Sequence, residues 1–231
     1  MDLVTATLQW LADPANWGGD NGIPARLEEH VALCAVSLLI AAAVAMPLGL
    51  FIGHTGRFSW LIASSANAWR ALPSFAVIAL LVPFTTIVDP DLGFTLYPTV
   101  IAMVVLAGPP LLINSYQGVA AVDRDLVEAA RGMGMTERQI LTGLEIPVAL
   151  PVIGTGIRLA AVQVIATATL GSIFGFGGLG RFIVLGDANQ DNGEMMGGVV
   201  LVTALALVTF GLFTLIERRL VSPGLKVGSG D

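Results

Sequence analysis

Long apolar stretches are the feature that most constrains the fold of this chain. An α-helix needs about 20 apolar residues to cross the ~30 Å hydrocarbon core of a bilayer. Only 12% of the 231 residues are charged, whereas soluble domains carry roughly a quarter. The sequence therefore predicts an all-α membrane protein with five core transmembrane helices, the second of which begins amphipathically at Phe58. The five apolar stretches are residues 31–52, 71–88, 96–113, 148–174 and 195–216.

Cationic residues distinguish the two sides of the predicted membrane domain. With the N-terminus outside, the cytoplasmic segments would contain seven Lys and Arg residues and the outer segments only two. Because positive residues are enriched in cytoplasmic loops, this distribution predicts an external N-terminus and a cytoplasmic C-terminus. The seven are Arg57, Arg124, Arg131, Arg138, Arg218, Arg219 and Lys226, and the two are Arg26 and Arg181.

The same orientation divides the chain into regions. Before the first span, a short amphipathic helix over 2–12 and the rings of Trp10 and Trp17 are expected at the membrane interface. The regions are an extracytoplasmic or interfacial N-terminal segment at 1–27, a transmembrane domain at 28–218 with a polar cytoplasmic loop at 120–147, and a cytoplasmic tail at 219–231.

Composition argues against several classes of function. The net charge of −6 gives no support for nucleic-acid binding, and the single Cys34 excludes disulfides and cysteine metal sites. His30 and His54 lie at opposite ends of the first span, too far apart for a metal site or a proton relay. The glycine-rich stretch 175–180 lacks the Lys-Ser/Thr pair of a phosphate-binding loop. We therefore expect no catalytic residue, metal or nucleotide on this chain.

The polar loop contains the longest interruption between apolar stretches. Its residues 123–147 hold five of the 17 acidic residues and three of the 11 cationic ones, so the stretch must face water or another protein. Asp123 or Asp125 can cap a short helix at its start. Gly132 and Gly134 can end that helix, because glycine readily adopts the left-handed conformation of a helix stop.

A second short helix is predicted over 137–142. Thr136 and Gln139 have the spacing of a capping box at its start. Pro147 suits the first turn of the next span and is expected to prevent a continuous helix from before it. These features predict a helix–turn–helix on the cytoplasmic face, and a solvated loop is the alternative.

Residue types at fixed spacing in this stretch match a known motif. The stretch resembles the EAA loop of ABC-importer permeases, in which E-A-A is followed by G and then by I-x-L-P, with isoleucine and leucine exchanged here. The resemblance implies a coupling helix that docks into a groove of a cytoplasmic ATPase. It also implies that the glutamate braces the loop by ion pairing and that the glycine makes the turn. The matching residues are Glu128, Ala129, Ala130, Gly134, Leu144, Ile146 and Pro147.

Further motifs resemble the quaternary-amine, or osmoprotectant, branch of these permeases. Together they cover most of the chain, and one departure is Phe176, where the branch more often has alanine. The motifs are Glu29-His30-Val31, Pro47-Leu48-Gly49, Leu72-Pro73-Ser74, Asn-Ser-Tyr-Gln-Gly at 114–118, Gly156-Ile157-Arg158 and the glycine-rich stretch 175–180.

This resemblance implies the five-helix fold of type I ABC importers, shared with the methionine importer. It implies a transporter subunit, rather than an enzyme, in a bacterial plasma (inner) membrane, for glycine betaine, carnitine, choline or proline betaine. The implied partners are two ATP-binding subunits that hold ATP and magnesium, a substrate-binding protein, a second permease chain that is identical or paralogous, and membrane lipid. Alternatives are an importer for methionine, another amino acid or ergothioneine, and a non-ABC carrier or scaffold.

Polar residues and glycines near the spans are candidates for the substrate pathway or its gate. An intramembrane arginine is costly unless it faces protein or water, so Arg158 either lines the pathway or serves packing. The amides of Asn114 and Gln163 either contact substrate or form interhelical hydrogen bonds. The glycines at 175–180 predict a non-helical turn, interpreted as an outer gate or as packing only. The candidates are Pro73, Ser74, Asn114, Arg158, Gln163, Gly177, Gly178, Leu179 and Gly180, and Arg70 is expected near the cytoplasmic entry of the second span.

Overall fold

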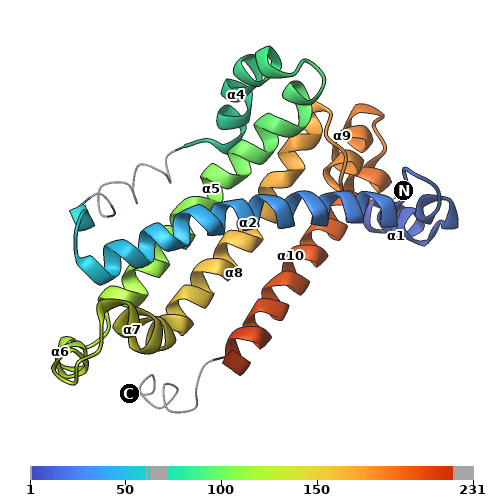
Figure 1. Ribbon diagram of the computed structural model, residues 1–231. Helices are drawn as coiled ribbons and strands as arrows, with labels where there is room; N and C mark the ends of the chain where they lie inside the picture. Colours follow the sequence, from blue (N-terminus) through green and yellow to red (C-terminus); the bar gives the residue numbers. More distant parts are fainter. Residues whose placement is uncertain (1, 61, 63–71, 221–231) are drawn as a thin grey trace. The chain divides into compact units, whose positions relative to one another are not determined.

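The computed structural model describes residues 2–60, 62 and 72–220, and all regular structure within these residues is helical (Figure 1). The elements in chain order are α1 (Leu3–Ala12), η1 (Pro14–Trp17), α2 (Ile23–Thr55), α4 (Ser74–Val88), α5 (Leu92–Ala120), α6 (Arg124–Gly132), α7 (Glu137–Ile140), η2 (Leu141–Glu145), α8 (Ile146–Gly171), η3 (Ser172–Phe174), α9 (Gly180–Ala188) and α10 (Asn192–Leu220).

Four helical stretches among the described residues are long and apolar enough to cross a membrane. They are α2, α5, the run Glu137–Phe174 and most of α10, and they coincide with the first, third, fourth and fifth predicted spans. The second predicted span is represented by α4, which has only 15 residues. Most of its expected amphipathic beginning, residues 61 and 63–71 with Arg70, lies outside the described residues, as do residues 221–231 of the predicted tail. The orientation of the termini stays a prediction.

The chain divides into two compact units. The first unit holds α1, η1, α4, η3 and α9, the second holds α6, α7 and η2, and each of the four long helices contributes a part to both. The first unit is Met1–Leu39, Leu72–Leu106 and Ala161–Thr209, and the second is Ile40–Ala71, Ala107–Ala160 and Phe210–Asp231.

An aromatic and aliphatic cluster organises one end of the first unit. The indole of Trp10 on α1 meets the ring of Phe182 on α9 edge to face, with centroids 5.1 Å apart. Ile23, at the start of α2, and Leu179 are almost completely buried in the same cluster. The predicted N-terminal helix is therefore present as α1, and burial of its tryptophan packs it against α2 and α9 (Figure 1).

Small residues let helices approach one another closely in the second unit. A side chain at Gly49 of α2 would place its Cβ only 2.8 Å from the Cβ of Ser115 on α5. A Cβ at Gly156 of α8 would lie 2.6 Å from that of Asn114, also on α5. Small residues at helix contacts are typical of membrane proteins, where close packing replaces the hydrophobic effect. The buried core beside these contacts consists of Val119, Ala149 and Ile153.

Candidate functional site

The polar loop is folded as a helix, a tight turn and a second helix within the second unit. Helix α6 begins at its cap Asp123, whose Oδ1 accepts a hydrogen bond from the backbone of Asp125 at 2.9 Å. It ends in a turn at Gly134, whose φ of +87° is in the left-handed region. The backbone N–H of Met135 closes the turn by donating to Ala130 at 3.2 Å. The structure thus confirms the predicted first helix and its glycine stop.

The second helix starts as predicted but does not end as predicted. Thr136 and Gln139 form the capping box at the start of α7. The helix then continues without a break through η2, a π-helical segment, into α8. The expectation that Pro147 would prevent a continuous helix is therefore wrong. A wider π turn, in which the backbone N–H of Ile146 bonds to Leu141, accommodates a residue that lacks a donor and would clash with the preceding turn.

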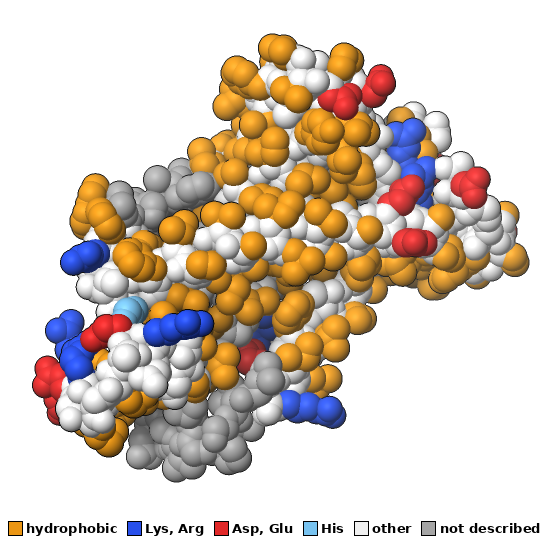
Figure 2. Space-filling view, viewed as in Figure 1, with side chains coloured by type: hydrophobic (Ala, Val, Ile, Leu, Met, Phe, Trp, Pro, Cys, Tyr) orange, Lys and Arg blue, Asp and Glu red, His pale blue; other side chains and the backbone are white. Residues whose placement is uncertain are grey.

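One face of the α6–α7 segment is buried against the rest of the second unit, and another face is exposed to solvent. Ala130 of the motif and Ile140 are buried and anchor the segment. Glu128 and Ala129 are exposed, and Met133 at the end of α6 is 77% exposed. Figure 2 shows charged side chains gathered over this segment. The exposed face combines an acidic side chain, a small residue and a flexible apolar one, which is a composition suited to contact with another protein.

The turn is braced by an ion pair that sequence analysis did not identify. Arg131 of α6 donates from Nε to Glu137 Oε1 at 2.7 Å and from Nη2 to Oε2 at 2.9 Å. These hydrogen bonds, and then the charge of the carboxylate, raise the pKa of Arg131 above its ordinary value. Among the described residues Glu128 has no hydrogen bond or ion pair. A bracing role for the motif glutamate stays a prediction, and within this chain the ion pair that braces the turn is made by Glu137.

A histidine joins α2 to the same segment. His54 Nδ1 lies 2.6 Å from Glu145 Oε2, and His54 Nε2 lies 3.3 Å from Glu137 Oε2. The Glu145 side chain is only 6% exposed, whereas that of Glu137 is 56% exposed. Sequence analysis placed His54 at the inner end of the first span but gave it no partner. The available signal was Glu145, a carboxyl group beside an apolar stretch, which requires a polar partner when buried.

The remaining residues of the motif lie on η2 and α8. Leu144 and Ile146 are half-buried and Pro147 is exposed. The motif therefore extends from the exposed end of α6, through the buried Glu145, to the first turn of α8. The continuous helix that includes α8 begins at Glu137, after the turn that ends α6, and His54 of α2 contacts this helix at Glu137 and Glu145.

The glycine-rich stretch forms a tightly packed turn in the first unit. Gly178 has a φ of +73°, and its backbone N–H donates to Glu29 Oε2 at 2.8 Å. A side chain at Gly177 would require the ends of the Glu29 and Arg26 side chains to move, because its Cβ would lie against their Oε2 and Nη1 atoms. The carbonyl of Gly177 accepts a hydrogen bond from Ser172 Oγ at 2.8 Å. The predicted non-helical turn is present, its contacts are those of packing, and a gate role stays a prediction.

Leu179 and Gly180 complete this turn and begin α9. Leu179 is 1% exposed and belongs to the aromatic cluster. Gly180 leaves no room for a Cβ, which would lie 2.6 Å from Ser172 Oγ. Neither residue presents a side chain to solvent, so their contribution is to hold the turn in place.

Arg158 is paired through its Nη1 with side chains of α10 in the second unit, whereas its buried Nε has no hydrogen-bond partner among the described residues. Its Nη1 donates to Glu217 Oε2 at 2.5 Å and to Thr214 Oγ1 at 3.2 Å. Its guanidinium carbon lies 5.0 Å from the centroid of the Phe210 ring. Thr155 adds a hydrogen bond to the same Glu217 at 3.0 Å. This geometry favours the structural interpretation of Arg158, since pairing offsets the cost of an arginine among apolar residues.

The other pathway candidates do not form one site. The amide of Asn114 donates to Pro110 of its own helix at 2.8 Å, so it makes no interhelical hydrogen bond there. Gln163 is exposed. Pro73 caps α4 and Ser74 begins it. Asn114 and Arg158 belong to the second unit and the other candidates to the first, so the structure assigns them no common site.

The chain is similar in sequence to permeases of transport systems. The family model of the binding-protein-dependent transport system inner membrane component matches residues 45–227. The chain is 36% identical over 198 residues to the carnitine transport permease protein OpuCB of Listeria monocytogenes. This alignment covers 86% of this chain and 88% of the relative. The chain is 32% identical, with the same coverage, to the choline transport system permease protein OpuBB of Bacillus subtilis.

The fold is similar to that of a solved ABC transporter. A chain of the MetNI methionine ABC transporter, in an inward-facing conformation, aligns with a TM-score of 0.75 and 21% identity. The alignment covers 87% of this chain and 96% of that one. At this identity the likeness concerns the fold alone, and it confirms the expected type I importer permease architecture.

Proposed function

Because this chain belongs to the family of binding-protein-dependent transport system inner membrane components, we propose that it is the permease subunit of an ATP-driven importer for quaternary-ammonium osmoprotectants. It is a multi-pass protein of the plasma membrane, with four long apolar helices among its described residues. The observation that carries the substrate class is the similarity, at 32–36% identity over most of the chain, to permeases named for carnitine and choline.

The exposed face of the α6–α7 segment is the basis for the subunit roles proposed for the importer. The importer has two ATP-binding subunits, which hold ATP and magnesium, and one of them binds to the exposed face of this segment at Glu128, Ala129 and Met133. A substrate-binding protein delivers substrate at the opposite membrane face, and a second permease chain, identical or paralogous, completes the pathway. The exposure of Glu128 and the absence of a hydrogen bond or ion pair to it among the described residues support a contact with another subunit.

The proposed transmission of force uses three connections. Arg131 and Glu137 keep α6 and α7 as one body. The uninterrupted helix from Glu137 to Phe174 carries movement of that body into the membrane. The contact between His54 and Glu145 carries it to α2. The glycine turn at 177–180 acts in this scheme as the outer gate, which changes its packing on Glu29 when the segment moves.

The test is transport by a reconstituted complex. The permease is co-purified with its ATPase and its binding protein, and uptake of labelled glycine betaine, carnitine and choline is measured with and without ATP. Uptake that requires ATP and the binding protein supports the proposal. A permease that co-purifies with no ATPase, or a complex that imports methionine but no quaternary amine, would overturn it.

A further inference from the structure

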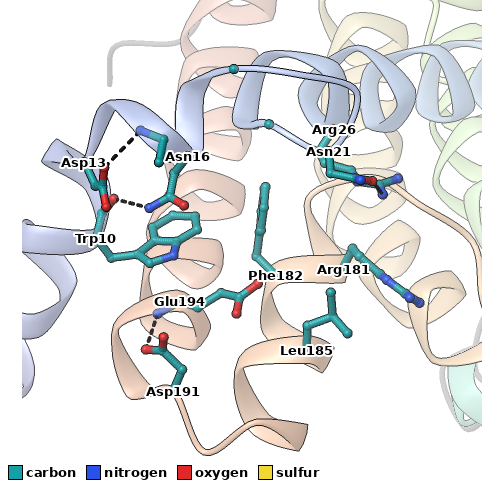
Figure 3. A pocket seen from close by; sticks show the side chains of 13 residues that line it. Trp10, Asp13, Asn16, Asn21, Arg26, Arg181, Phe182, Leu185, Asp191 and Glu194 are labelled. Atoms are coloured by element: carbon teal, nitrogen blue, oxygen red, sulfur yellow. Dashed lines mark hydrogen bonds between the residues drawn. The ribbon is translucent and has the colours of Figure 1, made fainter.

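An open cavity of about 660 Å³ lies in the first unit, between α1, the start of α2, α9 and the start of α10 (Figure 3). Its wall includes the rings of Trp10 and Phe182 together with charged side chains of both signs. Its volume lies in the range of roughly 300–1,000 Å³ that is typical of pockets for small ligands, although its wall is mostly polar. The cavity uses none of the residues assigned above to the coupling segment.

Most charged groups of this cavity already have partners within the chain. Arg26 is paired with Glu29 at 2.7 Å and also binds Asn21. Asp191 accepts hydrogen bonds from the backbone of Gly193 at 2.9 Å and of Glu194 at 3.1 Å, at the start of α10. These groups are therefore occupied in holding the wall of the cavity together.

Two opposite charges of the cavity have no such partner. The side chains of Arg181 and Glu194 make no hydrogen bond or ion pair with any described residue, nor with each other. Figure 3 shows the carboxylate of Glu194 on the side of Trp10 and the guanidinium of Arg181 extending on the other side. Half-buried charges that remain unpaired are free to bind a ligand that carries both signs.

The aromatic wall beside Glu194 is held rigidly. The ring of Trp10 lies edge to face with Phe182 at 5.1 Å. It also packs so closely on Gly197 of α10 that a side chain there would collide with it. The backbone carbonyl of Trp10 accepts a hydrogen bond from the Asn16 amide at 2.8 Å. A fixed tryptophan next to a free carboxylate is the arrangement that attracts a quaternary ammonium group, through cation–π attraction and charge.

We propose that this cavity binds a zwitterion with a quaternary ammonium group and a carboxylate, such as glycine betaine, with the ammonium group at Trp10 and Glu194 and the carboxylate at Arg181. The assignment rests on the proposed function for its substrate class, and it narrows that class. An unpaired Arg181 can bind the carboxylate of a zwitterion, but it offers no favourable contact to a ligand such as choline that carries only a positive charge. The cavity therefore favours zwitterions over choline.

The experiment measures binding of labelled glycine betaine and of labelled choline to the purified permease–ATPase complex, without the binding protein. Saturable binding of glycine betaine is expected. Trp10→Leu weakens it about 5- to 30-fold, the range that corresponds to loss of a cation–π contact. Glu194→Gln weakens both ligands at least 5-fold. Arg181→Gln weakens glycine betaine by a similar factor and changes choline less than 2-fold.

Matched variants separate a binding defect from a folding defect. Trp10→Phe keeps an aromatic ring and is expected to retain binding within about 5-fold. Glu28→Gln and Arg57→Gln remove the same charges from exposed positions outside the cavity and are expected to change nothing. Each complex is first checked by gel filtration, and Glu194→Gln and Arg181→Gln carry the test if Trp10→Leu does not form the complex.

Two results would overturn the assignment while leaving the proposed function intact. One is a complex that transports glycine betaine with its binding protein, yet binds it with an affinity that none of the cavity variants alters. The other is an Arg181→Gln complex that loses choline binding as strongly as glycine betaine binding. The proposed function itself fails on a different result, the absence of uptake of every quaternary amine by the complete importer.

Discussion

Removal of the His54 side chain should destabilise the protein strongly, because it leaves Glu145 without its partner. Glu145 is 4% exposed, and His54 Nδ1 at 2.6 Å is its only side-chain partner among the described residues. Breaking a buried pair by deleting one member costs about 3–5 kcal/mol, since the other member remains buried and unpaired. For a chain of this size that loss lowers Tm by roughly 6–20 °C. The variant His54→Leu tests this, with Tm of the purified protein in detergent as the readout.

A double variant separates the buried pair from the general packing of α2. Replacing a buried ion pair by apolar side chains of similar size is often neutral or stabilising. His54→Leu with Glu145→Leu is therefore expected to recover most of the Tm lost in His54→Leu alone. Glu137→Gln removes the exposed carboxylate from the same histidine and should lower Tm by less than roughly 4 °C, because exposed pairs contribute little.

The same variants also test whether the His54–Glu145 contact couples ATP hydrolysis to transport. If the His54–Glu145 contact transmits movement to α2, the double variant should be stable but should hydrolyse ATP with little uptake. Two results would refute the reasoning: a Tm of His54→Leu within about 4 °C of the wild type, or a double variant no more stable than the single one. Either result would mean that the Glu145 carboxylate does not depend on His54 for a polar partner, and that the contact between the two residues does not stabilise the protein.

Three further predictions concern the turns and the intramembrane pair. Gly134→Ala should destabilise by about 1–2 kcal/mol because alanine is strained at a φ of +87°, whereas Gly132→Ala, which also meets no neighbouring atom, should be nearly neutral in urea unfolding. Gly180→Ala should lower Tm because its Cβ collides with backbone atoms of Thr169, whereas Gly108→Ala has free space and should not; equal Tm values for the two would show that the turn is not closely packed. Arg158→Met alone should cost about 3–5 kcal/mol and Arg158→Met with Glu217→Met much less, as measured by thermal unfolding; additive losses would argue against a buried pair.

Patterns local in sequence predicted the helices well. The apolar stretches predicted the four long helices among the described residues, and Asp123, Gly134 and the Thr136–Gln139 pair predicted both ends of α6 and the start of α7. These signals work because hydrophobic length and capping depend on residues a few positions apart. The predicted helix break before Pro147 was wrong. A single proline in a helical pattern predicts a break, but here a π-helical turn beside Pro147 keeps the helix continuous.

The contacts that matter for the candidate site were harder to predict because they are not local. His54 and Glu145 are 91 residues apart, and no spacing rule connects them. Glu128 was expected to brace the loop, but which of three nearby glutamates meets a cation depends on how α6 and α7 turn. The cavity joins Trp10 to residues beyond position 180, so nothing in either stretch indicated it. The orientation of the termini stays a prediction from the distribution of charge.

The most direct test of the proposed function is uptake into proteoliposomes that contain the permease with its ATPase, with the binding protein outside and ATP inside. The wild type should accumulate labelled glycine betaine or carnitine only when ATP and the binding protein are both present. The variant Glu128→Lys should keep its Tm, because Glu128 is exposed and unpartnered among the described residues, yet lose uptake together with ATPase binding. Accumulation that continues without the ATPase, or unchanged uptake and ATPase binding in Glu128→Lys, would contradict the role proposed for this chain.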